Sequence, residues 1–470
     1  MLAKWLTEDE DTANCTPAAI LDFPQDIFTV AQRREGAAVL HAILAFYLFI
    51  LLAIACDDYF VPAIERIVQV LQVSDDVGGA TLMAAATSSP ELFINVVGTF
   101  VTEGDLGVGA VLGSAVFNIL AVPACCGIFA SKEIILDWWP MTRDCAVYAI
   151  SVIGLIVCLA DELVYWYEAA MLVTFYLFYI LIMYKNEAVS AWAHRVITCW
   201  NRPTASSPET SPLLLPSHIK QDRSESRQSG SVSQFADTEI SSRGENTECG
   251  EYSLWWLLTG PIRLALWLTI PDCRRHRHLY PVTFVMCIAW IGATTYVITW
   301  MITVIGDTLH IPDSVMGITF LAAGTSVPEA VSSVIVTRQG HGGMGISNSL
   351  GSNTFDILLC LGLPWLIKSS MLALAPESTV TSIKQAGRDS HAMLEAQNRA
   401  VLINSHGLEY SAISLLSSTL VLFVTFAWYH FRLNRKVGVA CLLLYVGFLA
   451  LASTIELNGF FVVNLPTCDR

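Results

Sequence analysis

Two stretches of sequence decide the architecture: GATLMAAATSSPEL at residues 79–92 and GITFLAAGTSVPEA at residues 317–330. Each continues into a second matching block, GVGAVLGSAVFNIL at residues 107–120 and GISNSLGSNTFDIL at residues 345–358. When residues 79–120 are aligned without a gap to the second copy, 18 of 42 positions are identical at a constant offset of 238. Chance does not give such agreement, so the chain contains an internal repeat.

The composition is that of a membrane protein. Hydrophobic residues make up 54% of the 470 residues and charged residues only 14%, whereas a soluble protein carries about 25% charged residues. This excludes a soluble globular enzyme. The net charge of −15 gives no footprint for nucleic acid. The 13 cysteines lack a C-x-x-C pair, which argues against a disulfide scaffold or a zinc ribbon.

A helix needs about 20 apolar residues to cross a bilayer, and ten runs meet this need. They cover residues 39–55, 77–100, 107–130, 144–160, 166–184, 280–305, 312–336, 345–368, 411–430 and 437–456. An eleventh run, at residues 254–270, contains Gly260, Pro261 and Arg263. We interpret it as an interfacial or half-buried helix. The fold class predicted is an all-α membrane protein with about ten transmembrane helices.

The two copies of the repeat are predicted to be inverted. Each copy covers two consecutive spans, and five spans separate equivalent positions. An odd number of spans reverses the direction through the membrane, which gives two inverted five-helix repeats. Many secondary transporters have inverted repeats with interrupted helices and a site at the midplane between them.

Loop charges predict the orientation. Lys and Arg favour cytoplasmic loops and concentrate between spans five and six, although Arg33 and Arg34 before the first span run against the pattern. The expected domains are an extracytoplasmic tail (1–38), a first membrane half (39–184, with repeat 79–120), a cytoplasmic linker (185–279), a second membrane half (280–456, with repeat 317–358) and an extracytoplasmic tail (457–470).

The linker and the N-terminal tail carry short signals. Residues 201–250 are rich in Ser, Thr, Pro, Gly and Glu, so we expect a largely disordered linker. Residues 209–214 resemble an acidic dileucine signal, with a chance leucine run as the alternative, and serines nearby suggest kinase or trafficking partners. Asn14 opens a glycosylation sequon, Asn14-Cys15-Thr16.

Two glutamates, Glu91 and Glu329, fall near the middles of their spans. A charge there costs about 2.5–3.5 kcal/mol on insertion scales, so each needs a partner or a cation. Pro90 and Pro328 precede them. Because proline disturbs the preceding helical turn, it frees carbonyl oxygens, which are tolerated at this depth only if they face a cavity or a ligand.

Helical spacing stacks further polar groups beside the glutamates. The stacked sets are Thr87, Glu91 and Asn95; Thr325, Glu329 and Ser333; Ser114 and Asn118; and Ser352 and Asp356. This all-oxygen set suits hard cations such as Ca²⁺, Na⁺ and K⁺, and the motif lacks the ligands of zinc or copper. For the hydroxyl groups alone, hydrogen bonds between helices are an equal alternative. We interpret Gly109-x-x-x-Gly113 as close helix packing and His41 as a packing residue.

These residues resemble the alpha repeats of the cation/calcium exchanger superfamily, most of all the potassium-dependent sodium/calcium exchangers. Besides ATSSPEL and GTSVPEA, the runs GSAVFNIL, GITFLAAGTSVP, LTIPDC, INSHGL and FVVNLP look like that family, over about residues 56–185 and 254–468. The resemblance implies a ten-span fold with an extruded cytoplasmic loop. It also implies that inward Na⁺ drives export of Ca²⁺ together with K⁺, with no cofactor.

Position by position, the resemblance implies that Glu91 and Glu329 are the chief ligands of Ca²⁺ and Na⁺. Asp356 matches the acid associated with K⁺ dependence, where K⁺-independent relatives carry an amide. Supporting places fall to Thr87, Ser88, Thr325, Ser326, Ser114, Asn118 and Ser352. Three positions depart from the family: Glu329 replaces a usual Asp, Ala86 a usual Gly and Gly343 a common Asp. These departures bear on cation preference rather than on the fold.

The sequence thus predicts an antiporter that works by alternating access, and no enzyme. The alternatives are a Ca²⁺/H⁺ or Mg²⁺ exchanger on the same fold, and a cation channel, against which the inverted repeat argues. An intramembrane hydrolase is less favoured because the motif offers no His or Lys base beside its Ser and Glu. We expect the plasma membrane, with an internal organelle as the alternative. The expected partners are inorganic cations and the lipid bilayer; the sequence leaves the oligomeric state open.

Overall fold

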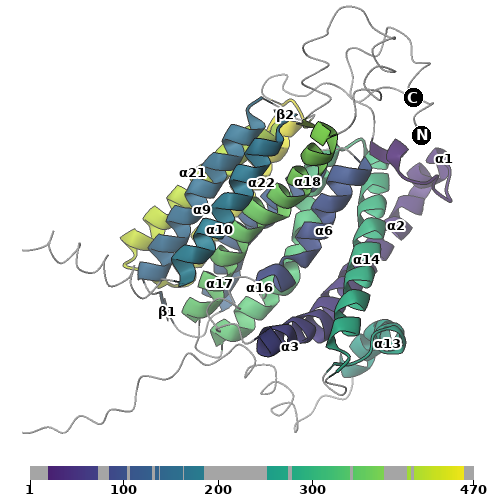
Figure 1. The fold of residues 1–470 in the computed structure, drawn as a ribbon, viewed down its shortest axis with the longest axis horizontal. Coiled ribbons are helices and arrows are strands. Elements are labelled where there is room, and N and C mark those ends of the chain that lie inside the picture. The colour runs from purple at the N-terminus through teal and green to yellow at the C-terminus, as the bar shows by residue number, and fades with distance from the viewer. Residues whose placement is uncertain are drawn as a thin grey trace, which may run out of the picture.

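The computed structural model describes residues 19–71, 84–102, 106–129, 133–136, 138–161, 163–184, 251–273, 278–338, 342–374, 400–403 and 407–459. Nearly all of these residues are helical, and the long helices lie side by side in one bundle (Figure 1). The predictions for Asn14 and for the disorder of residues 201–250 lie outside the described residues.

The first half comprises η3 (Ala19–Asp22), α1 (Val30–Gln32), η4 (Arg33–Ala37), α2 (Ala38–Ala55), η5 (Cys56–Phe60), α3 (Val61–Leu71), α5 (Ala84–Thr87), α6 (Ser89–Val97), η7 (Gly98–Thr102), α7 (Leu106–Val116), η8 (Phe117–Ala121), α8 (Val122–Phe129), β1 (Ile134–Ile135), α9 (Trp138–Leu159), β2 (Leu163–Val164) and α10 (Trp166–Tyr184). The second comprises α13 (Glu251–Thr269), α14 (Tyr280–Leu309), α15 (Asp313–Met316), η9 (Gly317–Leu321), α16 (Ala322–Arg338), α17 (Gly342–Phe355), η10 (Asp356–Leu361), α18 (Gly362–Leu374), β3 (Val401–Leu402), α21 (Gly407–Trp428), β4 (Arg432–Leu433) and α22 (Arg435–Glu456).

Within the described residues, eight helices are long and apolar enough to cross a membrane, and a bent pair over residues 313–335 would make nine. They match the predicted spans, except that the run at 77–100 begins outside the described residues. Helix α13 is not among the eight, and Figure 1 shows it almost end-on while α2 and α14 run along the page. That direction fits an interfacial helix. The prediction of an all-α membrane protein is confirmed.

Two short antiparallel strand pairs reveal the inversion. Strand β1 pairs with β4, and β2 pairs with β3. By their order along the two halves, β1 is equivalent to β3 and β2 is equivalent to β4. Superposing one half on the other therefore places the β1–β4 pair on the β2–β3 pair. The two pairs lie at opposite ends of the bundle, as β1 and β2 show in Figure 1. An exchange of ends is what an inverted repeat requires.

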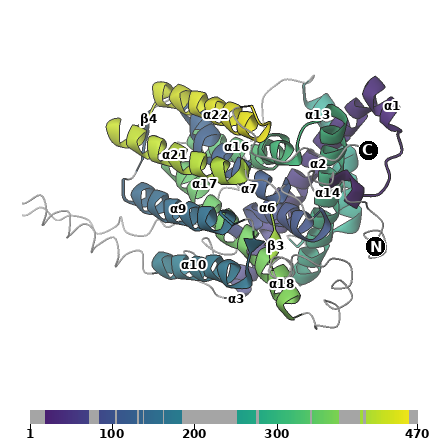
Figure 2. The same cartoon turned by 90° about the horizontal axis from the view of Figure 1, so that it is seen from above.

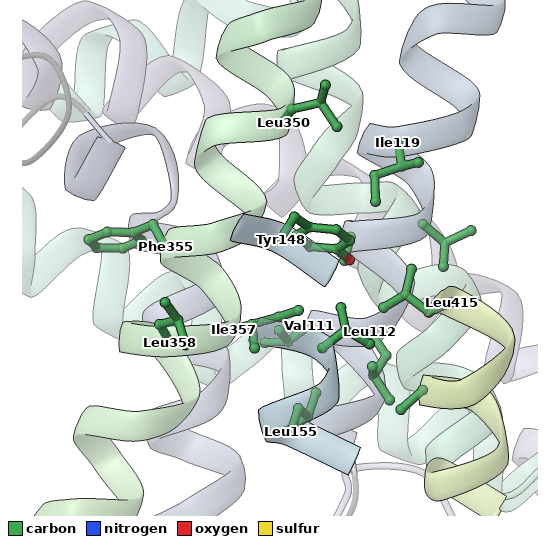
Figure 3. Close-up of a cluster of buried hydrophobic side chains, with 14 of the residues drawn as sticks. Val111, Leu112, Ile119, Tyr148, Leu155, Leu350, Phe355, Ile357, Leu358 and Leu415 are labelled. Atoms are coloured by element: carbon green, nitrogen blue, oxygen red, sulfur yellow. The ribbon is translucent and has the colours of Figure 1, made fainter. Parts of the chain in front are cut away.

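The buried apolar side chains form two clusters. The larger joins α7–α10 with α17, α18, α21 and α22, and Figure 3 shows Tyr148 of α9 near its centre, among side chains that include Leu112, Ile119 and Leu415. The smaller joins α2, η5, α3, α13 and α14 with residues of the repeat helices α6, α7, α15 and η9. The α2–α14 pair lies on the side of the molecule away from α9 and α10 (Figure 2).

Helix α7 lies directly on α15 and η9, the start of the second repeat. A Cβ atom added at Gly109 would stand 2.8 Å from the carbonyl oxygen of Ser314, and one added at Gly113 would meet the carbonyl of Ile318. Only glycine permits this approach, so the interpretation of Gly109-x-x-x-Gly113 as close packing is confirmed. The two copies of the repeat are in backbone contact here.

The basic residue Arg33, which runs against the charge rule, is buried and paired. Its Nη2 lies 3.3 Å from Oδ2 of Asp307 at the end of α14, and its Nε lies 3.8 Å from Oδ2 of Asp26. Asp26 also contacts His41, whose Nε2 lies 3.1 Å from Oδ1. The interpretation of His41 as a packing residue is therefore incomplete, since its ring is part of this polar cluster. Because Arg33 is neutralised locally, its charge says little about orientation.

Candidate functional site

The helix of the first copy breaks beside its glutamate. Helix α5 ends at Thr87, Ser88 leaves the helical conformation (φ −92°, ψ 14°), and α6 begins at Ser89 with Pro90 in its first turn. Glu91 therefore lies in the first turn of a new helix, where unpaired backbone N–H groups favour a negative charge. The break that Pro90 predicts is present.

The second copy bends at the equivalent place. The helical axes before and after Pro328 differ by 50°, and Glu329 follows directly. The helix is otherwise continuous from Ala322 to Arg338. Both glutamates thus lie where proline distorts a helix inside the bundle.

The carboxylate of Glu329 receives hydrogen bonds from both copies of the repeat. The hydroxyl of Ser352 donates to Oε1 at 2.8 Å, and the amide of Asn118 donates to Oε2 at 2.9 Å. Asn118 belongs to η8 of the first copy and Ser352 to α17 of the second. The candidate site therefore has a hydrogen bond that crosses the interface between the two copies of the repeat.

Glu91 has a different environment. Its side chain is only 4% exposed, and its Oε2 has no hydrogen-bond partner within the described part of the chain. Charge interactions link it to Glu329 and to Asp356, which is 1% exposed. Under the repeat, Asp356 occupies the place of Asn118. Glu329 thus accepts a hydrogen bond from an amide, whereas Glu91 interacts with the charge of a second carboxylate.

The supporting residues behave unequally. Ser88 lies within hydrogen-bonding reach of Asp356, and Thr325 lies beside Glu91. The hydroxyl of Ser326 is buried without a partner in the described residues. The hydroxyl of Ser114 instead donates to the carbonyl of Val111 in its own helix at 3.3 Å.

Thr87 is exposed at the end of α5. The structure therefore brings the three carboxylates together with Asn118, Ser352, Ser88 and Thr325, and places Thr87 at the margin. Ligation of a cation by these residues stays a prediction.

Sequence reasoning missed several polar residues next to the site. Asn353 is fully buried: its Nδ2 donates to the carbonyl of Ala115 at 3.3 Å, and its Oδ1 accepts a hydrogen bond from Nδ2 of Asn118 at 3.2 Å. Ser349 donates to the carbonyl of Asn118 at 3.1 Å. Cys360 lies 3.8 Å from Oδ1 of Asp356 through its Sγ. The available signal was a run of polar residues within a buried helix, but the repeat drew attention only to positions that are polar in both copies.

The donor chemistry is that of a hard-cation site. In the described residues, no three His, Cys, Asp or Glu side chains are placed to hold a metal by themselves. Hydroxyl, amide and carbonyl oxygens would have to complete a coordination shell, and such oxygen ligands suit Ca²⁺ and the alkali cations. A buried carboxylate facing another carboxylate carries a large penalty unless a positive charge joins them.

A family model and the related sequences agree on one family. A family model described as "Sodium/calcium exchanger protein" matches residues 41–185 and 279–454. Human "Sodium/potassium/calcium exchanger 3" is 35% identical, with 97% of this chain and 87% of that protein covered. Human "Sodium/potassium/calcium exchanger 5" is 36% identical, with 95% and 89% covered. A solved structure of the sodium-calcium exchanger NCX_Mj is similar with a TM-score of 0.45 at 21% identity, covering 88% of this chain and 98% of that one.

Proposed function

The chain belongs to the sodium/calcium exchanger protein family, and from this we propose that it exchanges Na⁺ for Ca²⁺ together with K⁺ by alternating access. Relatives named as sodium/potassium/calcium exchangers match nearly its whole length. Such a protein transports cations as substrates and needs no resident cofactor.

The observation that carries this proposal is the charge interaction between the buried carboxylates of Glu91 and Asp356. Both side chains are buried, their charges repel each other, and Oε2 of Glu91 lacks a hydrogen-bond donor in the described residues. Bringing a cation between them replaces repulsion by two attractions. Glu91, Glu329 and Asp356 together supply three negative charges when ionised, which is the total positive charge of one Ca²⁺ and one K⁺.

Competition for the same oxygens couples the fluxes. Ca²⁺ with K⁺, or several Na⁺, would occupy the carboxylates in turn, so neither set can cross while the other is bound. Ser352 and Asn118 would continue to orient Glu329 in both states, since each donates to one of its oxygens.

The moving part is the α2–α14 pair. It shares a buried apolar cluster with the repeat helices, and two of its contacts with them place an aromatic ring over a glycine. Phe49 of α2 covers Gly324, and Phe93 of α6 lies over Gly292 of α14. A ring on a glycine surface has no side chain interlocked with it, so we propose that the α2–α14 pair slides there.

Ca²⁺ flux into proteoliposomes, with Na⁺ and K⁺ varied independently, tests the function. We expect Ca²⁺ uptake only when Na⁺ is trapped inside, and much faster uptake with external K⁺. Uptake driven by a proton gradient without Na⁺ would favour a Ca²⁺/H⁺ exchanger. Conductance without any counter-ion would indicate a channel.

We place this integral membrane protein in the plasma membrane, where an inward Na⁺ gradient is available to drive Ca²⁺ export. Surface biotinylation of intact cells tests this location, and exclusive recovery from internal membranes would favour the organelle alternative.

The same experiment, with and without glycosidase treatment, tests the proposed glycan on Asn14. Deletion of the dileucine-like segment at residues 209–214 tests the proposed trafficking partner, and the measured quantity is the fraction of the protein at the cell surface.

A further inference from the structure

The segment before the first span, residues 19–29, lies across one end of the bundle; we call it the N-terminal strap. Its η3 turn packs against both α14 and η7, and appears as the purple turn beside the upper end of α14 in Figure 1. By the predicted orientation, this is the outer end. The strap thus touches the α2–α14 pair on one side and a repeat helix on the other.

The strap is fastened firmly to the α2–α14 pair. Phe23 is only 6% exposed, and its ring centroid lies 5.6 Å from that of Tyr296 in α14. Asp26 joins the strap to Arg33 and His41, and Arg33 continues the cluster to Asp307 of α14. A capping box between Thr29 and Gln32 then begins α1.

The far end of the strap meets the repeat core instead. The backbone of Ala19 hydrogen bonds to the carboxyl group of Asp313 in α15. Helix α15 packs mainly on α7 and η9, and its Ser314 lies against Gly109 of α7. Thr99 and Thr102 belong to η7, the element that η3 contacts, and both side chains are buried. The strap therefore bridges the two bodies that must separate if the outer end opens.

We propose that the N-terminal strap is an outer gate carried by the α2–α14 pair. Asp26 fixes the strap to that pair, and the surfaces of η7 and α15 that η3 contacts are the seat on which it closes. The inference rests on the proposed alternating access. When the pair slides, η3 leaves its seat and opens the space over η7; when the pair returns, η3 closes that space again.

Two disulfide crosslinks of the full-length protein test the gate. The pair Ala19→Cys/Asp313→Cys joins the strap to the core, whereas Phe23→Cys/Tyr296→Cys joins it to α14, on which it rides. In proteoliposomes we expect oxidation to reduce Na⁺-dependent Ca²⁺ exchange at least tenfold for the first pair, with recovery on reduction, and to leave the second pair within twofold of its reduced rate. The four single-cysteine variants control for oxidation of native cysteines.

Each outcome is decisive for the gate. If the first pair crosslinks on a gel but exchanges at its reduced rate, or if it fails to crosslink, the strap does not seat on the core. If neither the unmodified protein nor the reduced variants show Na⁺-dependent exchange, the result contradicts the proposed function rather than the gate.

A second measurement does not depend on transport. Thr102 is buried in η7, the element that the strap contacts. In the Thr102→Cys protein, the new thiol should react with a membrane-impermeant thiol reagent several-fold faster when Asp26→Asn removes the charge of Asp26. Unchanged labelling in the Asp26→Asn protein, with normal detergent extraction as the folding control, would overturn the role of Asp26.

Discussion

Asn118 of the first repeat donates a 2.9 Å hydrogen bond to Glu329 of the second, whereas its counterpart Asp356 interacts with the charge of Glu91. The inverted repeat is therefore asymmetric at the site. One half satisfies its glutamate with an amide, and the other half stores an extra negative charge. This difference between Asn118 and Asp356 is the physical basis that we propose for a second, monovalent cation.

Asp356→Asn should make Ca²⁺ transport much less dependent on K⁺. The substitution leaves two carboxylates, whose charge one Ca²⁺ balances alone, and the new amide can donate to Glu91 as Asn118 donates to Glu329. Ca²⁺ flux at fixed Na⁺ over a K⁺ titration measures this. The matched variant is Asn118→Asp, which places a fresh carboxylate against Glu329 and should impair exchange. Undiminished K⁺ stimulation in Asp356→Asn would refute the assignment.

Glu329→Gln should abolish exchange. The side chain loses its charge, and an NH₂ group must then face either the amide of Asn118 or the hydroxyl of Ser352, both of which donate in the native site. We expect less than about one hundredth of the native Ca²⁺ flux, which corresponds to more than about 2.7 kcal/mol of lost stabilisation. Near-normal flux in vesicles, at equal protein content, would overturn the site.

Glu91→Gln should also stop exchange but should stabilise the cation-free protein. The substitution removes the charge repulsion between Glu91 and Asp356 and offers Asp356 an amide donor. A hydrogen bond to a charged group contributes about 1.5–3 kcal/mol. Thermal unfolding in detergent without Ca²⁺, Na⁺ or K⁺ should show a higher Tm than the native protein, and added Ca²⁺ should raise it less. A lower Tm in the absence of cations would mean that Glu91 is not held against a carboxylate.

The fold could be predicted from the sequence because the patterns that determine it are local in the chain. Span length follows from apolar runs, and inversion follows from an odd number of spans between copies, both of which the helices and the strand pairs bear out. The pairing of Glu329 with Ser352 and Asn118 was also within reach, because repeat positions that are polar in both copies point to a shared interface.

Other features could not be predicted from one sequence. The role of Arg33 depends on Asp307, far away in the chain, so charge counting treated it as a topological signal when it is a buried ion pair. Ser114 and Ser352 are equivalent in sequence, yet one bonds its own helix and the other bonds Glu329. Helical spacing gives the face of a residue but not its partner, which depends on how the two copies are offset in space.

Gly324→Ala should slow exchange without unfolding the protein. Gly324 lies in the bent helix just before Thr325, and the ring of Phe49 covers it so closely that an added Cβ would overlap the ring. Phe49 must turn aside, which places a methyl group in the sliding surface between α2 and the repeat helices. We expect exchange to fall about tenfold with a small loss of Tm.

Phe49→Ala should restore much of the exchange rate in the double variant, because it removes the ring that collides with the new methyl group. The matched control is Gly447→Ala in α22, where an added Cβ meets no atom within 4 Å. Equal rates for Gly324→Ala and Gly447→Ala would show that α2 does not move across this glycine.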